Sequence, residues 1–328
     1  MNYCLCKLKF LTPLHTGDSE RAKSLDGSSM CFCADTLFSA LCCIADSHRG
    51  AEGAAELCRL AERGDLLFSD TMPFHHDTLF VPRPVLLPVE KRVVSDVSDI
   101  KAFKNLKYIP VEQLSNLVSY FNGIGDFSPK DIFTDFGKSE ARERVAIAGL
   151  DQPSPYTVGT FSFNEDCGLY FIMSAADESI LDSVLDLVKL LGVSGVGGKV
   201  SSGLGKFTLA EDEMFFSSLD DCFCFDNQII LLWEMLENDY IQYMSITSSL
   251  PADGELDEAI NGAFYTLKRR GGFVQSASFN TAAKKQTQFF LAAGSLFSQK
   301  YHGELFNVYN GGAHKVYRYS KPLFLGVK

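Results

Sequence analysis

The feature that most constrains the fold is a glycine-rich stretch at residues 192–206, with the sequence GVSGVGGKVSSGLGK. Six glycines occupy the fourteen positions from Gly192 to Gly205, so the backbone can take positive φ and approach a ligand closely. Apolar residues at helical spacing predict an amphipathic helix over residues 177–191, ended by Gly192. A phosphate cradle is expected here, built from backbone N–H groups and from Lys199, Ser201 and Ser202.

Two nucleotide-binding motifs are excluded at this stretch. A Walker loop needs glycine five residues before Gly198 and a hydroxyl residue after the lysine, but Val193 and Val200 stand there. A G-x-G-x-x-G fingerprint that starts at Gly195 also fails at Val200. A purely structural glycine turn is the alternative, which the lysine and the paired serines make less favourable.

Composition indicates a globular chain that holds one large core or two domains. It has 328 residues, of which 46% are hydrophobic and 22% charged, so disorder is not expected. No apolar run reaches the roughly 20 residues needed to cross a bilayer, and residues 1–10 do not form a signal peptide. We therefore expect a cytoplasmic protein with no membrane partner.

The ten cysteines do not indicate a metal or redox site. None of the pairs has C-x-x-C spacing, which zinc sites and redox motifs favour. Buried, reduced thiols are expected instead, with no metal and no cofactor.

Charge is distributed unevenly along the chain. Although the net charge is −11, residues 261–328 contain ten Lys or Arg and a single acid, Glu304. Residues 211–260 contain thirteen Asp or Glu and no Lys or Arg. The bases are interleaved with aromatic residues and glycine, which favours a nucleic-acid-binding face over a solvated charge run. The acidic block is interpreted as a solvated face or a contact for a basic partner.

The patterns predict an α+β fold of two small sandwiches, each a sheet with helices on one face, divided near residue 210. Strands are expected at 1–12, 229–235, 288–292 and 314–319 and around Phe273, and a hairpin at 159–173. Helices are expected after a cap at Asp35 and Thr36, at 57–63 and at 254–266. Four prolines between 66 and 88 predict an extended or hairpin segment outside the sheet centre. Residues 90–151 are expected to form a projecting insertion.

Several segments resemble the RAMP superfamily of CRISPR proteins. GVGGKVSSGLGKF at 195–207 looks like its glycine-rich loop, LTPLHTG at 11–17 like the end of its first strand, and DTLFSA at 35–40 like the start of its first helix. The C-terminal half is similar, in order, to the family of fourth Csm subunits of type III-A effector complexes. The segments that carry this similarity are LPAD at 250–253, KRRGGFVQS at 268–276, the lysines at 284 and 285, AGSLF at 293–297 and HKVYRYSKP at 314–322.

The resemblance implies two tandem ferredoxin-like (RRM-like) domains. They would span residues 1–209, with a thumb-like hairpin insertion at about 70–155, and residues 210–328, with a basic C-terminal face. Such subunits cap the foot of the complex and bind the 5′ repeat-derived tag of the CRISPR RNA, which the thumb kinks. They also contact the large Palm-domain subunit and the first backbone RAMP subunit.

The RNA-binding residues follow from the position of the matching segments. Those expected to line the RNA or contact its phosphates, or neighbouring subunits, are His15, Gly195, Gly197, Gly198, Lys199, Ser201, Ser202, Gly203, Gly205, Lys268, Arg269, Arg270, Lys284, Lys285, His314 and Arg318. His314 is suited equally to a base contact and to packing within a strand pair.

An alternative function is a stand-alone, metal-independent endoribonuclease that processes CRISPR precursor RNA. His15 has the chemistry of a general base for it, but no convincing acid/base partner is found, and a hydrogen-bonding role in the turn is favoured. Asp35 corresponds to the start of a helix, where capping explains it. The sequence therefore favours a non-catalytic, RNA-binding subunit with no catalytic residues.

Overall fold

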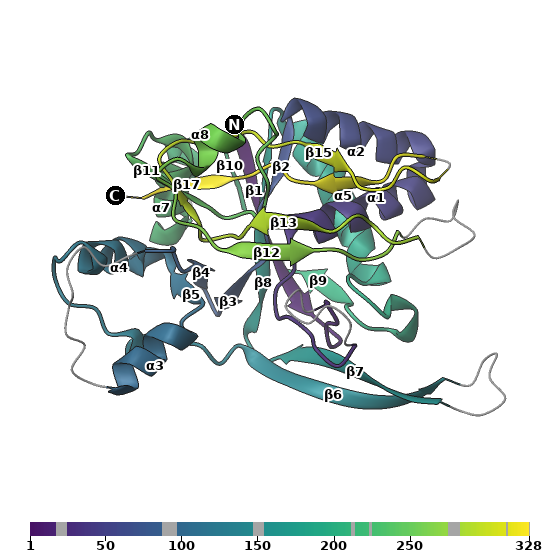
Figure 1. Ribbon diagram of the computed structural model, residues 1–328, viewed down its shortest axis with the longest axis horizontal. Helices are drawn as coiled ribbons and strands as arrows, with labels where there is room; N and C mark the ends of the chain where they lie inside the picture. The colour runs from purple at the N-terminus through teal and green to yellow at the C-terminus, as the bar shows by residue number, and fades with distance from the viewer. Residues whose placement is uncertain are drawn as a thin grey trace.

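The computed structural model describes residues 1–17, 25–86, 97–146, 154–210, 214–222, 225–274, 283–312 and 314–327. Helices and antiparallel strands are mixed along the chain (Figure 1). This mixture of helices and strands confirms the predicted α+β class.

The centre of the fold is an antiparallel sheet, with strand order β10-β1-β8-β3-β4-β5. Two short strands join it beside this path, since β9 pairs with β1 and β2 with β8. The bounds are β1 Asn2–Phe10, β2 Leu66–Phe68, β3 Met72–His75, β4 Thr78–Pro82, β5 Tyr108–Pro110, β8 Cys167–Ala175, β9 Phe207–Leu209 and β10 Met214–Phe216.

The strand predicted at the N-terminus is confirmed as β1, and its alternation separates two cores. Cys4 and Leu8 belong to one buried cluster, and Tyr3 and Leu5 belong to another. Successive side chains of a strand point to opposite faces, so both faces of the central sheet are covered.

The first face is covered by α1 (Ala34–Arg49), α2 (Ala51–Arg63) and α5 (Glu178–Ser194). The predicted helix over 177–191 is confirmed as α5, whose N-terminus is capped by Asp177. It ends at Gly195 rather than Gly192. Gly192 remains helical and buried, where an added Cβ would lie 2.5 Å from the carbonyl oxygen of Phe207.

The predicted cap of α1 is wrong. Cys33 is the N-cap residue and makes no side-chain cap hydrogen bond. Instead, Asp70 Oδ1 accepts the N–H of Ala34 at 2.8 Å. Asp35 lies in the first turn of the helix and is buried. Its carboxylate does not cap the helix and instead makes the ion pairs described below.

The second face is covered by α4 (Leu114–Phe121), α7 (Asn227–Glu237) and a small sheet of order β14-β11-β17. These strands are β11 Gln242–Ser245, β14 Leu296–Phe297 and β17 Phe324–Val327. The strand predicted at 229–235 is wrong, because this run forms α7. Asp226 caps the helix by accepting the N–H groups of Gln228 and Ile229, a local signal that overrides the apolar run.

The hairpin predicted at 159–173 is also wrong. The segment contains β7 (Ser154–Phe163) and β8, but β7 pairs with β6 (Gly137–Ala146) along its whole length. β8 pairs instead with β1, β2 and β3. The β6–β7 ribbon extends from the body of the molecule (Figure 1).

The proline-containing segment forms the predicted hairpin, since β3 pairs with β4 from Phe74 opposite Leu79. However, β3 lies inside the sheet, between β8 and β4, so its expected exclusion from the sheet centre is wrong. Pro73 is tolerated because the ladder with β4 begins at Phe74, and Pro73 pairs only with β8.

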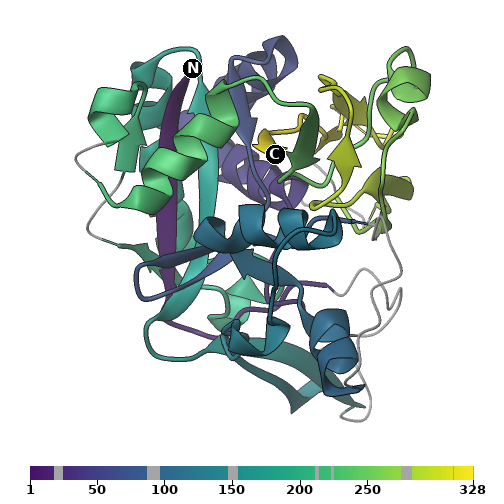
Figure 2. The same cartoon turned by 90° about the vertical axis from the view of Figure 1, so that its left-hand side faces the viewer.

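The predicted insertion at 90–151 is only partly separate from the body. Residues 90–96 and 147–151 of it lie outside the described residues. Helix α3 (Val97–Asn105) and the β6–β7 ribbon lie at the periphery (Figures 1 and 2). In contrast, β5 pairs with β4 and α4 contributes to the second core.

The C-terminal half also contains two ribbons. One pairs β12 (Leu267–Arg270) with β13 (Gln288–Leu291), and the other pairs β15 (Leu305–Asn307) with β16 (Tyr317–Tyr319). The strands predicted at 288–292 and 314–319 thus correspond to β13 and β16. Phe273 makes only an isolated bridge to Lys284, and the helix predicted at 254–266 is limited to α8 (Leu256–Ile260). Helix α6 covers Leu219–Cys222. Strand β10 follows residue 210, where the sequence predicted the division between the two domains, yet it pairs with β1 of the first half.

Candidate nucleic-acid interface

The glycine-rich loop connects the end of α5 to β9. Positive φ values occur at Gly195, Gly197, Gly203 and Gly205, and also at Lys199, where φ is 61°. A short 3-10 turn, Val200–Ser202, lies in its middle. The loop therefore folds back on itself, and Val196 N–H donates to the carbonyl of Gly205 at 2.9 Å.

The loop also rests on the turn that contains His15. Gly198 N–H donates to the His15 carbonyl at 2.8 Å, and Gly205 N–H donates to the Pro13 carbonyl at 2.9 Å. An added Cβ would lie 2.4 Å from the His15 carbonyl oxygen at Gly197 and 2.7 Å from the His15 ring at Gly198. These glycines are thus required by packing within the protein.

His15 fastens this turn to β7. Its Nδ1 donates to the carbonyl of Gly159 at 2.6 Å, and the residue is only 5% exposed. This geometry agrees with the hydrogen-bonding role in the turn that the sequence favoured over general base catalysis.

The solvent-facing part of the loop is its middle. Ser201 and Ser202 are exposed and Lys199 is half-buried. Lys199 Nζ lies 4.8 Å from the ring centroid of Tyr156 on β7, a cation–π contact that positions the ammonium group. Sequence reasoning missed Tyr156, because it is 43 residues away from the lysine in the chain and no local pattern connects the two.

Two of the predicted RNA-contacting arginines lie in an internal ion-pair network. Arg270 Nε donates to Asp35 Oδ2 at 3.1 Å, and Arg318 Nε lies 3.7 Å from the same oxygen. Arg318 is 2% exposed and also donates to the carbonyls of Arg270, Gln286 and Gly271. Arg270 and Arg318 thus have structural partners inside the protein, and their predicted contacts with phosphates or neighbouring subunits stay predictions.

The electrostatics of this network follow from its burial. Burial alone would raise the pKa of Asp35, but the guanidinium groups of Arg270 and Arg318 lower it below its usual value. Asp35 is thus held as a carboxylate that neutralises buried cations. A carboxylate engaged in this way is a poor general base.

The other predicted basic residues differ in accessibility. Lys284 and His314 are exposed, and Arg269 is partly exposed. Lys285 is half-buried, and burial lowers the pKa of its ammonium group. His314 donates from Nδ1 to the Lys315 carbonyl at 2.8 Å and lies outside β16, which disfavours packing within the strand pair.

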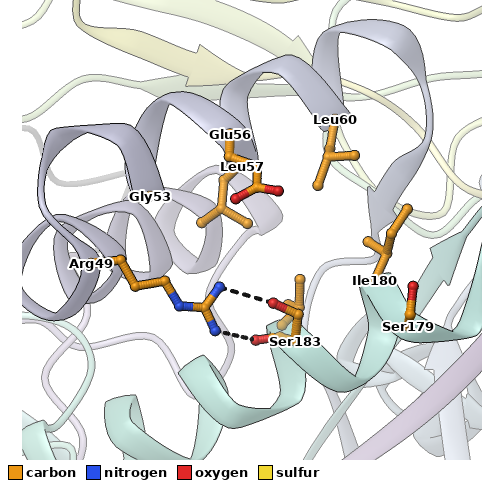
Figure 3. Close-up of a pocket in the computed structure, with 9 residues that line it drawn as sticks. Arg49, Gly53, Glu56, Leu57, Leu60, Ser179, Ile180 and Ser183 are labelled. Carbon is orange, nitrogen blue, oxygen red and sulfur yellow. Dashed lines mark hydrogen bonds between the residues drawn. The ribbon is translucent and has the colours of Figure 1, made fainter.

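Two hollows lie on or near α5. A cavity of about 140 Å³ separates α2 from α5, and Arg49 spans its edge to reach Ser183 (Figure 3). It is smaller than typical ligand pockets of roughly 300–1,000 Å³. A hollow of about 340 Å³ lies beside the glycine-rich loop, between α5 and β9, and is lined by Lys189, Gly192, Val193, Phe207, Thr208, Leu209 and Ala210.

Neither a metal cluster nor a membrane-spanning helix is found in the described ranges. No group of three or more His, Cys, Asp or Glu side chains is placed there to hold a metal ion. None of the helices described there has the length and apolar character needed to cross a membrane.

Comparison with known proteins decides the family. Residues 238–327 match the CRISPR Csm4 C-terminal domain. The CRISPR system Cms protein Csm4 of Mycobacterium tuberculosis (strain CDC 1551 / Oshkosh) is 32% identical over 317 residues, which cover 95% of this chain and 94% of the relative. The chain belongs to the Csm4 family. The Csm4 of Streptococcus thermophilus is 30% identical, over 92% of each chain.

Solved Csm4 structures share the fold. The Csm3–Csm4 subcomplex of a type III-A CRISPR-Cas interference complex matches with a TM-score of 0.62 and 15% identity, over 100% of both chains. A Csm1–Csm4 cassette in complex with cA4 matches with a TM-score of 0.61 and 18% identity, over 100% of this chain and 98% of the other. The resemblance noted in the sequence to the fourth Csm subunits is confirmed by the relatives that are 30% and 32% identical.

Proposed function

We propose that this chain is a non-catalytic, cytoplasmic subunit of a type III-A CRISPR interference complex in antiviral defence. In this role it binds the 5′ repeat-derived tag of the CRISPR RNA and links the large Palm-domain subunit to the backbone RAMP subunits. Membership of the Csm4 family supports the assembly, because solved relatives are bound to Csm1 and to Csm3.

The observation that supports RNA binding is the exposed middle of the glycine-rich loop. Lys199 is positioned over Tyr156, and Ser201 and Ser202, the second and third residues after it, are exposed. These groups suit a single-stranded RNA. The ammonium group and the two hydroxyls would contact its phosphates, and the aromatic ring would stack on a base.

The glycines contribute indirectly to this site. Gly197 and Gly198 let the loop pack on His15, which fixes where Lys199 and the serines emerge. Arg269, Lys284 and His314 are further candidate contacts for RNA or a partner, since their side chains are accessible. The tandem ferredoxin-like domains at 1–209 and 210–328, and a thumb within 70–155 that includes the β6–β7 ribbon, belong to the same proposal.

A non-catalytic role is supported by the state of the two candidate catalytic residues. Asp35 is paired with Arg270 and Arg318, and His15 is buried with Nδ1 bound to Gly159. The ion pairs make Asp35 a weaker base, and the burial of His15 keeps its ring from solvent, which disfavours both as the general base for an RNA 2′-hydroxyl.

The test is to purify the tagged protein from its host with whatever it binds, and to sequence the RNA. Intact RNAs that share one repeat-derived 5′ end, recovered together with the other Csm subunits, are expected. Cleaved repeat ends in the absence of partner proteins would instead favour the stand-alone endoribonuclease. Incubation of the purified chain with repeat RNA and EDTA provides the direct control, in which the RNA stays intact.

A further inference from the structure

Two cysteines meet across the helix pair α1 and α2. Cys42 lies in α1 and Cys58 in α2, and each is eight residues away from Gly50, which caps the end of α1 and the start of α2. When two helices fold back on each other at one residue, positions equally far from it come to the same level. The thiol of Cys42 is hydrogen-bonded to the thiol of Cys58.

The packing of the two helices explains this contact. Ala45 and Arg49 follow Cys42 by three and seven residues, so the three side chains share one face of α1. A Cβ added at Gly53 of α2 would lie 2.9 Å from the Ala45 carbonyl oxygen and 2.7 Å from Arg49 Cβ. This face of α1 therefore lies directly against α2, and Cys42 is directed toward Cys58.

Accessibility separates this pair from another close pair of cysteines. The Sγ atoms of Cys4 and Cys6 are 3.7 Å apart, but both residues are 0% exposed. Cys42 and Cys58 are only half-buried, so a small oxidant can reach them. The hydrogen bond from Cys42 lowers the pKa of the Cys58 thiol. A lower pKa increases the fraction of thiolate, which is the reactive form of cysteine.

We propose that Cys42 and Cys58 form a reversible disulfide when a hydroperoxide oxidises the protein, and that this bond joins α1 to α2. Both cysteines are free thiols in the structure. Free thiols agree with the cytoplasmic location proposed above, where protein disulfides are usually transient and redox-sensing. Bond formation requires neither RNA nor another subunit.

The oxidation proceeds in two steps that balance. The Cys58 thiolate attacks one oxygen of the hydroperoxide, so that an S–O bond forms, the O–O bond breaks and the departing oxygen takes up the proton that Cys58 lost. The Cys42 thiolate then attacks the sulfur of this sulfenic acid, the S–S bond forms, and hydroxide leaves as water with the proton from Cys42. The two thiols lose two electrons, which reduce the peroxide. A dithiol reverses the reaction by thiol–disulfide exchange.

The bond would constrain one layer of the fold. It closes a loop from residue 42 to residue 58 and thereby restricts the unfolded chain. Helices α1 and α2 pack on the same face of the central sheet, so oxidation stabilises this layer against unfolding.

The experiment treats the purified full-length protein with hydrogen peroxide, blocks the remaining thiols with iodoacetamide and maps linked peptides by mass spectrometry. The parent is expected to give one linked pair of peptides, which contain Cys42 and Cys58, and dithiothreitol should remove the link. The matched control is Cys43→Ser, at a neighbouring half-buried cysteine of α1, and it should form the same link. Cys42→Ser should instead leave Cys58 as a sulfenic acid that dimedone traps.

Thermal unfolding gives a second readout on the same samples. Peroxide should raise the thermal midpoint of the parent and of Cys43→Ser by about 5 °C, and it should leave the midpoint of Cys58→Ser unchanged. Each variant is compared with its own reduced form, which removes any effect of the substitution on folding. Alkylation of both Cys42 and Cys58 in the peroxide-treated parent would overturn the proposal. A link between a different pair of cysteines, or a sulfinic acid at Cys58 without any linked peptide, would also overturn it.

Discussion

Arg270 Nε donates a hydrogen bond of 3.1 Å to Asp35 Oδ2 and thereby joins residues that are 235 positions apart in the chain. The pair connects the first turn of α1 to the β12–β13 ribbon, and Arg318 completes it from β16. Asp35 thus connects both C-terminal ribbons to the first helix, beside the hydrogen bond from Arg270 to Thr36 and the ring contact between Tyr319 and Phe38.

Removal of that charge should destabilise the protein strongly. Asp35→Asn keeps the side-chain shape but leaves two guanidinium groups without their counterion, and loss of one partner of a buried pair costs about 3–5 kcal/mol. Urea unfolding measures the difference. Asp186→Asn, at an exposed aspartate of α5, is the control and should unfold like the parent. Equal midpoints for Asp35→Asn and the parent would contradict the importance of the network.

The same network predicts a dependence of stability on pH. The folded-state pKa of Asp35 is lowered, so its stabilising effect is fully present above the unfolded value of about 3.9. It is lost as the pH falls from about 4 through the folded-state pKa. Urea midpoints of the parent and Asp35→Asn should therefore differ most at pH 7 and approach each other as the pH falls below about 4 toward the folded-state pKa. A constant difference over this range would show that the carboxylate charge is not the cause.

Two glycines of the loop provide a matched pair of substitutions. Gly203 and Gly205 both have positive φ, of 82° and 74°, so alanine at either position carries a similar conformational cost of about 1–2 kcal/mol. A Cβ at Gly205 would also lie 2.0 Å from the Val196 carbonyl oxygen, whereas one at Gly203 meets nothing within 4 Å. Gly205→Ala should thus be less stable than Gly203→Ala by about 1–3 kcal/mol, as measured by urea unfolding. Equal losses would mean that the loop relaxes freely.

Lys199→Ala should weaken binding of the tag RNA modestly and reduce the salt slope of binding by roughly 0.7, the contribution of one phosphate contact. The control is Lys300→Ala, because Lys300 Nζ also lies 4.8 Å from a tyrosine ring centroid, that of Tyr243. Both variants lose a cation–π contact, but only the first changes the loop. Filter binding at several salt concentrations measures the slopes, and identical slopes for the two variants would remove Lys199 from the RNA site.

The sequence predicted best those elements whose signals are local. The amphipathic pattern of α5 and the alternation of β1 are read within a few turns or residues, and both elements are found where they were expected. The strand predicted at 229–235 failed because an apolar run alone does not separate a buried helix from a strand. The signal that decides is Asp226, placed to cap the first turn.

The pairing of strands and the direction of side chains could not be predicted in this way. Phe161 and Phe171 have patterns that suit a hairpin, yet their strands join different partners. Likewise, Arg269 and Arg270 are neighbours in a basic cluster, and only the strand geometry turns the second toward Asp35. Composition indicated a basic face, but it did not indicate which of the cationic side chains are paired with acidic groups inside the protein.

The position of β1 has a consequence for the order of folding during synthesis. β1 is the first element made, and its three ladder partners are β8, β9 and β10, which begin at Cys167, Phe207 and Met214. At about 5–20 residues per second, translation needs roughly 10–40 s to proceed from β1 to β10. Leu5 and Leu8 have no ladder partner until β8 has been made. The apolar side chains of β1 therefore stay without their sheet while more than 150 further residues are made, and the ladder on the other edge of β1 is completed only with β9 and β10.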